Sequence, residues 1–141
     1  MRERPRLRIV RECALRGESA VVSGCVRLLS DQVVDEQLIL VLGGSHAREL
    51  LAAGLPDGQR YWLRVWAARG LLWVWQDTAT SAIRAALKDD AWRVREMACK
   101  VVARHEVDVL VSRVPPLTVD PVPRVQRAAR RALEVLTSTR A

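Results

Sequence analysis

The sequence predicts an all-α fold, namely a right-handed α-solenoid of about four helical hairpins. The main observation is a self-match at a spacing of 31 residues, in which Leu63, Val94 and Val125 occupy equivalent positions. Self-similarity at a fixed period of this length indicates stacked supersecondary units. The composition agrees, because phenylalanine is absent and the abundant valine, leucine and alanine favour close helix packing. Further equivalent sets are Ala67, Ala98 and Ala129, and Leu71, Val102 and Leu133.

We expect one domain over residues 1–141, because a chain of 141 residues has the length of a single domain. The hydrophobic fraction of 50% and the charged fraction of 28% are typical of folded proteins and argue against disorder. The expected segments are a capping segment at 1–17, a weak repeat at 18–44, and clearer repeats at 45–75, 78–104 and 105–138.

The first part of the chain predicts the cap and the weak repeat. A lone helix is expected over 5–15, with Gly17 as its terminator. The weak repeat begins with a helix over 19–29. Its second helix is fainter, and its apolar positions are Val34, Leu38, Val41 and Leu42.

Each clearer repeat opens with a short first helix. One is expected over 45–53, because Ser45 is a favourable N-cap and Gly54 a favourable stop. The next is expected over 80–88. A third is expected over 106–114, where the Pro115-Pro116 pair should end it.

The second helices are longer and carry the repeat most clearly. In the unit at 90–102 the apolar residues follow the i, i+4, i+7, i+8 spacing of an amphipathic helix. Equivalent helices are expected over 57–75 and from Asp120 onward, where Asp120 would be the N-cap and Pro121 the first helical residue. Trp92 is expected in the turn before its helix, with a packing role. The apolar positions of the clearest unit are Val94, Ala98, Val101 and Val102.

The pattern Asp-x-x-x-Val-Arg-x-x-Ala-Cys-x-Val-Val, from Asp90 to Val102, resembles the HEAT repeat. It is most similar to the short HEAT-like repeat of the phycobilisome-lyase type. The resemblance covers residues 45–138 well and 18–44 weakly. It implies that the second helices line a concave partner-binding surface, and that Arg64 and Arg95 are structural arginines that pair with an aspartate between helices. Gln126 replaces the arginine in the last repeat, and Gly70 is unusual in mid-helix, where it costs about 1 kcal/mol relative to alanine.

A strip of aromatic and basic residues flanks the buried stripe of the second helices. Taking about 100° per residue, one helix places tryptophans and an arginine on one flank, and the same positions of the following helices hold mainly basic residues. Stacked repeats would align them in a strip that begins aromatic and becomes basic. These candidate binding residues are Trp62, Trp66, Arg69 and Trp73, then Arg93, Lys100 and Arg104, then Arg124 and Arg131.

Two interpretations of this strip stay open. Aromatic rings beside guanidinium groups suit stacking combined with phosphate contact, or binding to an acidic protein patch. Alternatively, Trp66 and Trp73 fill gaps in the core and the arginines form a solvated face. The net charge of +7 attracts polyanions, but it also fits a general compositional bias, because 16 acidic residues are interspersed with 23 basic ones.

The favoured function is a non-catalytic HEAT-like module that binds a protein partner through its second helices. The alternative is sequence-nonspecific binding of nucleic acid or another polyanion through the basic strip. A third interpretation follows from the resemblance alone, since some HEAT-like proteins are DNA glycosylases of alkylated purines. Those are longer chains, and this one has no acidic residue set among its aromatics. A homo-oligomer stays open, because the ends of short solenoids expose apolar surface unless they are capped.

No catalytic, cofactor or metal site is predicted. Cys13, Cys25 and Cys99 form no C-x-x-C pair, and Cys99 is expected to be a small buried residue. His46 and His105 have no ligand or catalytic partner at a suitable spacing, so structural roles at helix ends are expected. Residues 43–45, Gly-Gly-Ser, lack the rest of a phosphate-binding loop and are expected to form a turn. With no signal peptide or apolar run long enough for a membrane, we expect a cytoplasmic protein without a membrane partner.

Overall fold

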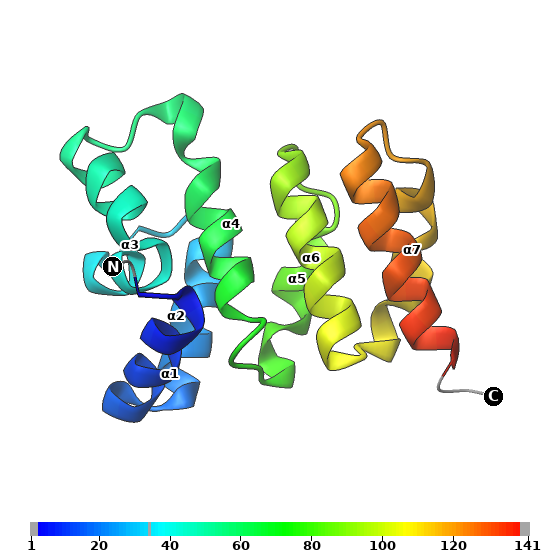
Figure 1. The fold of residues 1–141 in the computed structure, drawn as a ribbon, viewed down its shortest axis with the longest axis horizontal. Helices are drawn as coiled ribbons and strands as arrows, with labels where there is room; N and C mark the ends of the chain where they lie inside the picture. The colour runs from blue at the N-terminus through cyan, green and yellow to red at the C-terminus, as the bar shows by residue number, and fades with distance from the viewer. Residues whose placement is uncertain (1–2, 34, 139–141) are drawn as a thin grey trace. The chain divides into compact units, whose positions relative to one another are not determined.

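A computed structural model of the chain describes residues 3–33 and 35–138, and the regular structure in these ranges is entirely helical (Figure 1). The all-α prediction is therefore confirmed. The chain divides into two compact units, Met1–Ala79 and Thr80–Ala141, and each is described by itself. The stacking of all repeats in a single domain stays a prediction.

In the first unit, α1 and α2 confirm the helices expected over 5–15 and 19–29, and Gly17 ends α1 as predicted. The helix α1 packs on α2 and α3, and α4 packs on α2 and α3. The fully buried side chains at the centre of this unit include Ile9, Leu38 and Leu63. The elements are α1 (Pro5–Arg16), α2 (Glu18–Leu29), α3 (Glu36–Ala52), η1 (Asp57–Gln59), α4 (Tyr61–Gly70) and η2 (Asp77–Ala79), where η denotes a 3₁₀ helix.

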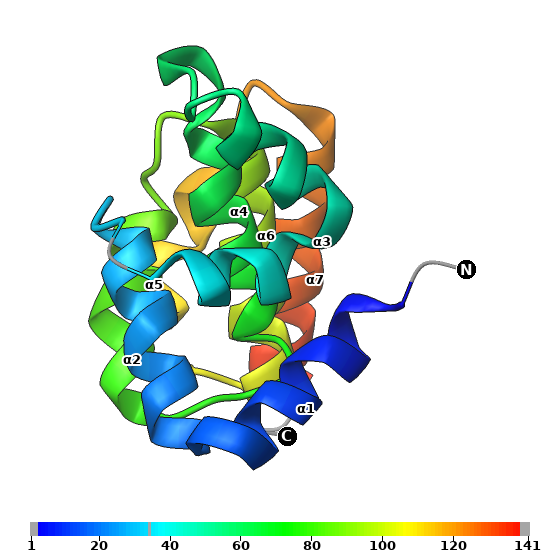
Figure 2. The ribbon, with the colours of Figure 1, turned by 90° about the vertical axis from the view of Figure 1, so that its left-hand side faces the viewer.

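Helix α3 joins two helices that the sequence predicts as separate. It begins after Asp35, whose carboxylate accepts a hydrogen bond from the Leu38 N–H at 2.9 Å, and Val34 of the predicted helix lies outside the described residues. In place of the predicted turn over 43–45, the chain bends sharply at Gly44, where φ is 61° and ψ is −137° (Figure 2). Only glycine adopts this backbone conformation without strain. The bend therefore takes a single residue and no connecting loop.

Helix α4 is shorter than the helix predicted over 57–75. Residues 57–59 form η1, α4 ends at Gly70, and Trp73 and Val74 lie beyond it. A β-carbon on Gly70 would lie 2.7 Å from Cδ2 of Leu42. This glycine thus lets α4 approach its neighbours closely, and because glycine is a weak helix former, it also favours an early end.

In the second unit, α5 confirms the helix expected over 80–88, and α6 confirms the clearest repeat helix. Trp92 is the first residue of α6, so its placement in the preceding turn is wrong. Helices α6 and α7 pack against each other (Figure 1), and the predicted apolar positions Val94, Ala98, Val125 and Ala129 are fully buried. The elements are α5 (Thr80–Ala86), α6 (Trp92–His105), η3 (Asp108–Arg113), η4 (Pro115–Val119) and α7 (Pro123–Ser138).

The α-helix predicted over 106–114 is absent from the described structure, and two 3₁₀ helices take its place. Pro115 starts η4 instead of ending a helix. The segment is rich in valine, which is stiff at χ1 and crowds an α-helical turn. Because Pro115 and Pro116 have no N–H groups, the carbonyls of Val111 and Ser112 lack α-helical partners, which disfavours an α-helix up to Val114. Short 3₁₀ turns satisfy both constraints.

The start of α7 also differs from the prediction. The helix begins at Pro123 and not at Pro121. Asp120 is therefore not the N-cap of α7, although its Oδ1 accepts a hydrogen bond from the Val122 N–H at 2.9 Å just before the helix begins. Even so, α4, α6 and α7 begin at Tyr61, Trp92 and Pro123, which preserves the 31-residue spacing of the sequence.

None of the helices in the described ranges combines the length and the apolar content needed to cross a membrane.

Candidate functional site

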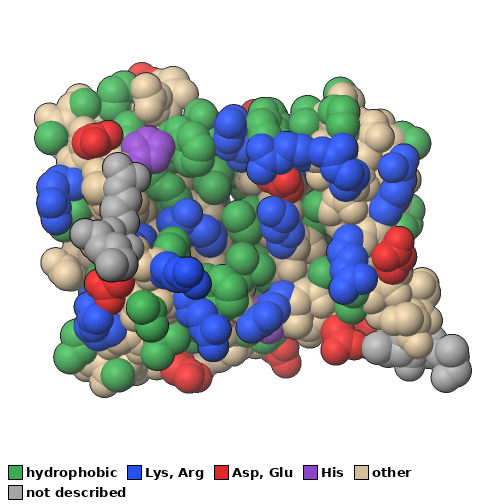
Figure 3. Space-filling model, in the orientation of Figure 1, with side chains coloured by type: hydrophobic (Ala, Val, Ile, Leu, Met, Phe, Trp, Pro, Cys, Tyr) green, Lys and Arg blue, Asp and Glu red, His purple; other side chains and the backbone are tan. Residues whose placement is uncertain are grey.

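The predicted binding residues fall into two groups, one in each unit. Arg93, Lys100 and Arg104 lie on α6, and Arg124 and Arg131 lie on α7; we call this set the α6–α7 basic face. Figure 3 shows Lys and Arg side chains gathered over these two helices. The strip predicted to continue onto α4 crosses the boundary between the units, so its continuity stays a prediction.

Trp92 is the aromatic centre of the α6–α7 basic face. The guanidinium carbon of Arg93 lies 4.4 Å from the centroid of the Trp92 ring, and that of Arg124 lies 4.9 Å from it. Both distances are within the range of a cation–π interaction. Because Arg124 comes from α7, the Trp92 ring links the two helices of the basic face.

Glu96 fixes the position of the Arg124 guanidinium. Its side chain is on α6 and only 7% exposed, and it accepts hydrogen bonds from Arg124 Nε at 2.9 Å and Nη2 at 3.0 Å. Lys100 Nζ lies 3.9 Å from the same carboxylate. A bidentate arginine–carboxylate pair defines both distance and orientation. The cation of Arg124 is therefore held at a set place while half of its side chain stays exposed.

The other cations of the basic face are more loosely held. Lys100, Arg104 and Arg131 are exposed, and the Arg131 Nη1 atom lies 3.8 Å from Glu134 Oε2, with both side chains largely in solvent. Exposed ion pairs of this kind contribute little stability. Lys100 and Arg131 can therefore exchange these ion pairs for contacts with a partner's anions at little cost.

Both arginines that the HEAT resemblance marks as structural pair with an aspartate between helices, so this prediction is confirmed. Arg64 Nη1 on α4 lies 2.9 Å from Asp31 Oδ1, which follows α2. Arg95 on α6 donates to both carboxylate oxygens of Asp120, at 2.8 and 3.2 Å. Burial acts to raise the pKa of Asp120, but the hydrogen bonds from Arg95 and the Val122 N–H outweigh it and hold that pKa below its usual range.

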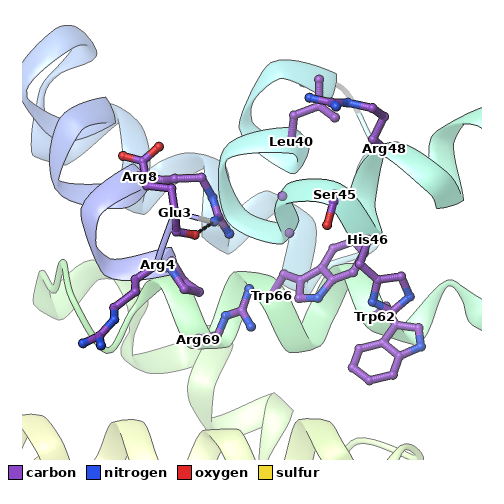
Figure 4. A pocket seen from close by; sticks show the side chains of 13 residues that line it. Glu3, Arg4, Arg8, Leu40, Ser45, His46, Arg48, Trp62, Trp66 and Arg69 are labelled. Atoms are coloured by element: carbon purple, nitrogen blue, oxygen red, sulfur yellow. Dashed lines mark hydrogen bonds between the residues drawn. The ribbon is translucent and has the colours of Figure 1, made fainter. Parts of the chain in front are cut away.

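A cavity of about 710 Å³ lies in the first unit, between the start of α1, the bend of α3 and α4 (Figure 4). Three of the four predicted residues of this unit, Trp62, Trp66 and Arg69, line it. Trp73 does not, because α4 ends before it; instead Arg6 lies over its ring, 5.6 Å from the centroid. The remaining lining residues are Glu3, Arg4, Pro5, Arg8, Leu40, Gly43, Gly44, Ser45, His46 and Arg48.

Two guanidinium groups of the cavity are anchored on backbone carbonyls. Arg8 Nε donates to the Val41 carbonyl at 2.7 Å, and Arg69 Nη2 donates to the Leu42 carbonyl at 2.6 Å. These carbonyls lie just before the bend at Gly44, where the end of a helical segment favours cations. Burial lowers the pKa of Arg69, and the nearby charge of Arg8 lowers it further. Arg69 Nε is buried and has no hydrogen-bond acceptor within the described ranges.

The aromatic side of the cavity is formed by a cluster of three rings. The His46 ring lies edge-on to Trp62 and Trp66, with centroids 5.0 and 5.1 Å apart, and the two indoles are stacked at 6.2 Å. Trp66 is only 2% exposed, so it belongs to the core. It therefore fits the interpretation in which this tryptophan fills a gap in the core, and not the one in which a partner stacks on its exposed face. Trp62 is half-buried and contributes to the wall of the cavity.

The sequence reasoning missed the part of the cavity that lies outside α4. Arg8 was not a candidate, and His46 was assigned only a role at a helix end. The available signal was the Gly43-Gly44 pair next to Ser45 and His46, which the sequence analysis assigned to a turn. Only the bend of α3 brings these residues opposite Arg69.

Two of the three cysteines are shielded from solvent. Cys25 and Cys99 are fully buried, and burial is the main cause that raises the pKa of each thiol to about 12. The prediction that Cys99 is a buried small residue is confirmed. Within residues 3–33 and 35–138, no three His, Cys, Asp or Glu side chains are grouped as metal ligands would be.

Comparisons of the chain with protein-family models, with curated proteins and with solved structures found no match. The HEAT resemblance therefore rests on the residues of the chain itself.

Proposed function

We propose that this protein is a non-catalytic binding module, a HEAT-like α-solenoid with a 31-residue period. The starts of α4, α6 and α7, which keep that spacing, support the proposal. The pairing of Arg64 and Arg95 with aspartates between helices supports it as well. In such a solenoid the second helices carry the surface on which partners bind.

The α6–α7 basic face is the surface that binds an acidic segment of a partner protein. The observation that carries this proposal is the contact of Trp92 with the guanidinium groups of both Arg93 and Arg124. A rigid aromatic ring with fixed cations beside it has the composition of a binding hot spot, since tryptophan and arginine are enriched there. The exposed Lys100 and Arg131 extend the positive charge around this centre.

Binding of nucleic acid by the same face is the second candidate. The stack of guanidinium groups on an indole favours it, because this combination also suits bases and phosphates. The carboxylates of Glu96 and Glu134 lie among the cations, however, and would repel a continuous run of phosphates. A protein partner of mixed charge can avoid or pair with them, so we place the acidic protein segment first.

The test is fluorescence anisotropy with three labelled probes, an oligoglutamate peptide, a single-stranded DNA and an RNA, each at several salt concentrations. The binding-face variant carries Arg93→Glu, Lys100→Glu and Arg131→Glu. A matched control carries the same change of charge at Lys88→Glu, Arg113→Glu and Arg130→Glu, three exposed residues of the same unit. Circular dichroism of both variants checks that they are folded.

We expect the binding-face variant to lose peptide affinity by more than about tenfold, and the control to change it by only about two- to threefold through long-range charge. Equal losses in the two variants would refute the assignment of the face. Tighter and more steeply salt-dependent binding of DNA or RNA than of the peptide would put the second candidate in its place.

A further inference from the structure

The cavity of the first unit has the size of a small-molecule site. Its volume of about 710 Å³ falls within the range of about 300 to 1,000 Å³ that is usual for ligand pockets. It lies within one unit, so its walls belong to a single compact body. The α6–α7 basic face is in the other unit, and the two surfaces share no residue.

The charge of the cavity is positive. Four arginines line it, Arg4, Arg8, Arg48 and Arg69, against the single carboxylate of Glu3. That carboxylate lies 2.5 Å from the Arg11 guanidinium, which is not part of the lining. Within the described ranges, Arg8 and Arg69 are held by carbonyl groups and not by carboxylates. Their full positive charges therefore face the cavity, with only partial negative charges to offset them.

The positions of Arg8 and Arg69 are set before any ligand arrives. Both are fixed by hydrogen bonds to the two carbonyls that precede the bend at Gly44. Burial first, and the like charge of Arg8 second, disfavour the charged form of Arg69 and lower its pKa. An anion placed between the two guanidinium groups would favour the charged form.

A second wall of the cavity is aromatic. In Figure 4 the Trp66 indole lies nearest to Arg69, and the imidazole of His46 and the indole of Trp62 lie beyond it, both in contact with Trp66. Flat rings of this kind contact the face or edge of a planar group. The adjoining Ser45 side chain provides a hydroxyl that donates or accepts. The cavity thus combines an anion-binding wall with a wall for a planar ring.

We propose that this cavity binds a small phosphate ester that carries a planar ring, of the nucleoside monophosphate class. Arg8 and Arg69 bind the phosphate, and the ring lies against Trp62 and His46. The exposed Arg4 and Arg48 add to the attraction at the rim.

Isothermal titration calorimetry of the full chain tests the proposal, with AMP, inorganic phosphate and adenosine as separate probes. We expect saturable binding of AMP, and affinities for phosphate alone and for adenosine alone that are weaker by at least about tenfold, since each lacks one of the two contacts. The absence of saturable AMP binding, or equal binding of adenosine and AMP, would overturn the proposal.

Variants locate the binding. Replacement of Arg69 risks unfolding because it caps the Leu42 carbonyl, so the decisive variant is the exposed pair Arg4→Glu and Arg48→Glu. We expect it to weaken AMP binding by about tenfold or more, whereas Arg27→Glu, an exposed change on α2 outside the lining, should alter it by no more than about twofold. Equal effects of the rim pair and of Arg27→Glu would refute the location. The binding-face variant of α6 and α7 should change AMP affinity by no more than the roughly two- to threefold expected from long-range charge, which separates this proposal from the proposed function.

Discussion

The Asp120 side chain joins α6 to the start of α7. Its substitution tests how much the ion pair between Asp120 and Arg95 stabilises the second unit. The Asp120 side chain is 4% exposed. The carboxylate accepts two hydrogen bonds from Arg95 and one from the Val122 N–H, and so connects the two helices before α7 begins. The substitution Asp120→Asn keeps the size of the side chain and removes its charge. Arg95 then stays partly buried beside a neutral group.

The expected cost is about 2 to 3 kcal/mol. Removal of one partner from a fully buried ion pair costs about 3 to 5 kcal/mol. The Arg95 side chain is 16% exposed and also donates to the Asp89 and Asp90 carbonyls, which the substitution leaves in place. Both facts move the expected value below that range. For a chain of this length, the loss corresponds to a fall in the melting temperature of roughly 10 °C.

The substitution also has a signature in the pH dependence of stability. The pKa of Asp120 is lower in the folded protein than in the unfolded chain, so the unfolded state binds its proton more readily. The stabilisation is therefore complete above the unfolded value of about 4, and it is lost as the pH falls through the lower folded value. In Asp120→Asn this part of the acid destabilisation should be missing, and the difference between the two proteins should shrink below about pH 4.

Urea denaturation followed by circular dichroism, at neutral pH and at several acidic values, measures both effects. Asp90→Asn is the matched control, because it makes the same chemical change at an exposed aspartate of the same unit. It should cost less than about 0.5 kcal/mol. If Asp120→Asn is no more destabilising than this control, or if its effect does not depend on pH, the reasoning about the ion pair is wrong.

Three further results are expected. Gly43→Ala should destabilise the protein by about 2 kcal/mol in urea denaturation, because a β-carbon there would lie 2.7 Å from a buried indole; an unchanged midpoint would show that the core relaxes around it. Glu96→Gln should elute from heparin at higher salt, since it leaves neighbouring cations without their carboxylate, and earlier elution would contradict this. Thiol labelling of the native protein should modify the half-buried Cys13 first. Cys25 and Cys99 are buried, with pKa values raised to about 12, so they should react only on unfolding. Modification of all three cysteines at one rate would contradict the burial.

The helices that could be predicted from the sequence are those whose stability comes from one long apolar stripe. In α6 and α7 the buried residues recur at helical spacing, so the pattern determines both the helix and its buried face. The segment over 106–119 also has regularly spaced valines, but its prolines and β-branched residues replace the α-helix by 3₁₀ turns. The end of α4 depends on how closely Gly70 approaches Leu42. This is a contact between two helices, and it cannot be predicted from the local sequence pattern of α4.

The residues of the candidate sites also divide into those that helical spacing predicts and those that depend on tertiary structure. Helical spacing places Trp62, Trp66 and Arg69 on one flank of α4, and they do line one cavity. The spacing fails for Trp73, because the helix to which it was extrapolated ends at Gly70. Arg8 is absent from the prediction because its role arises only from the bend of α3, a tertiary feature that depends on the φ angle of a single glycine.

The two candidate sites hold their arginines by different chemistry, and this difference has a consequence. In the cavity, Arg8 and Arg69 are fixed by carbonyl oxygens that are available because α3 breaks at Gly44; in an unbroken helix those oxygens would accept bonds from the N–H groups four residues on. On the basic face, Arg124 is fixed by the carboxylate of Glu96. Removal of the Glu96 charge therefore loosens Arg124 but leaves the anchors of the cavity in place, so Glu96→Gln should alter polyanion binding to the α6–α7 basic face and leave AMP binding to the cavity unchanged.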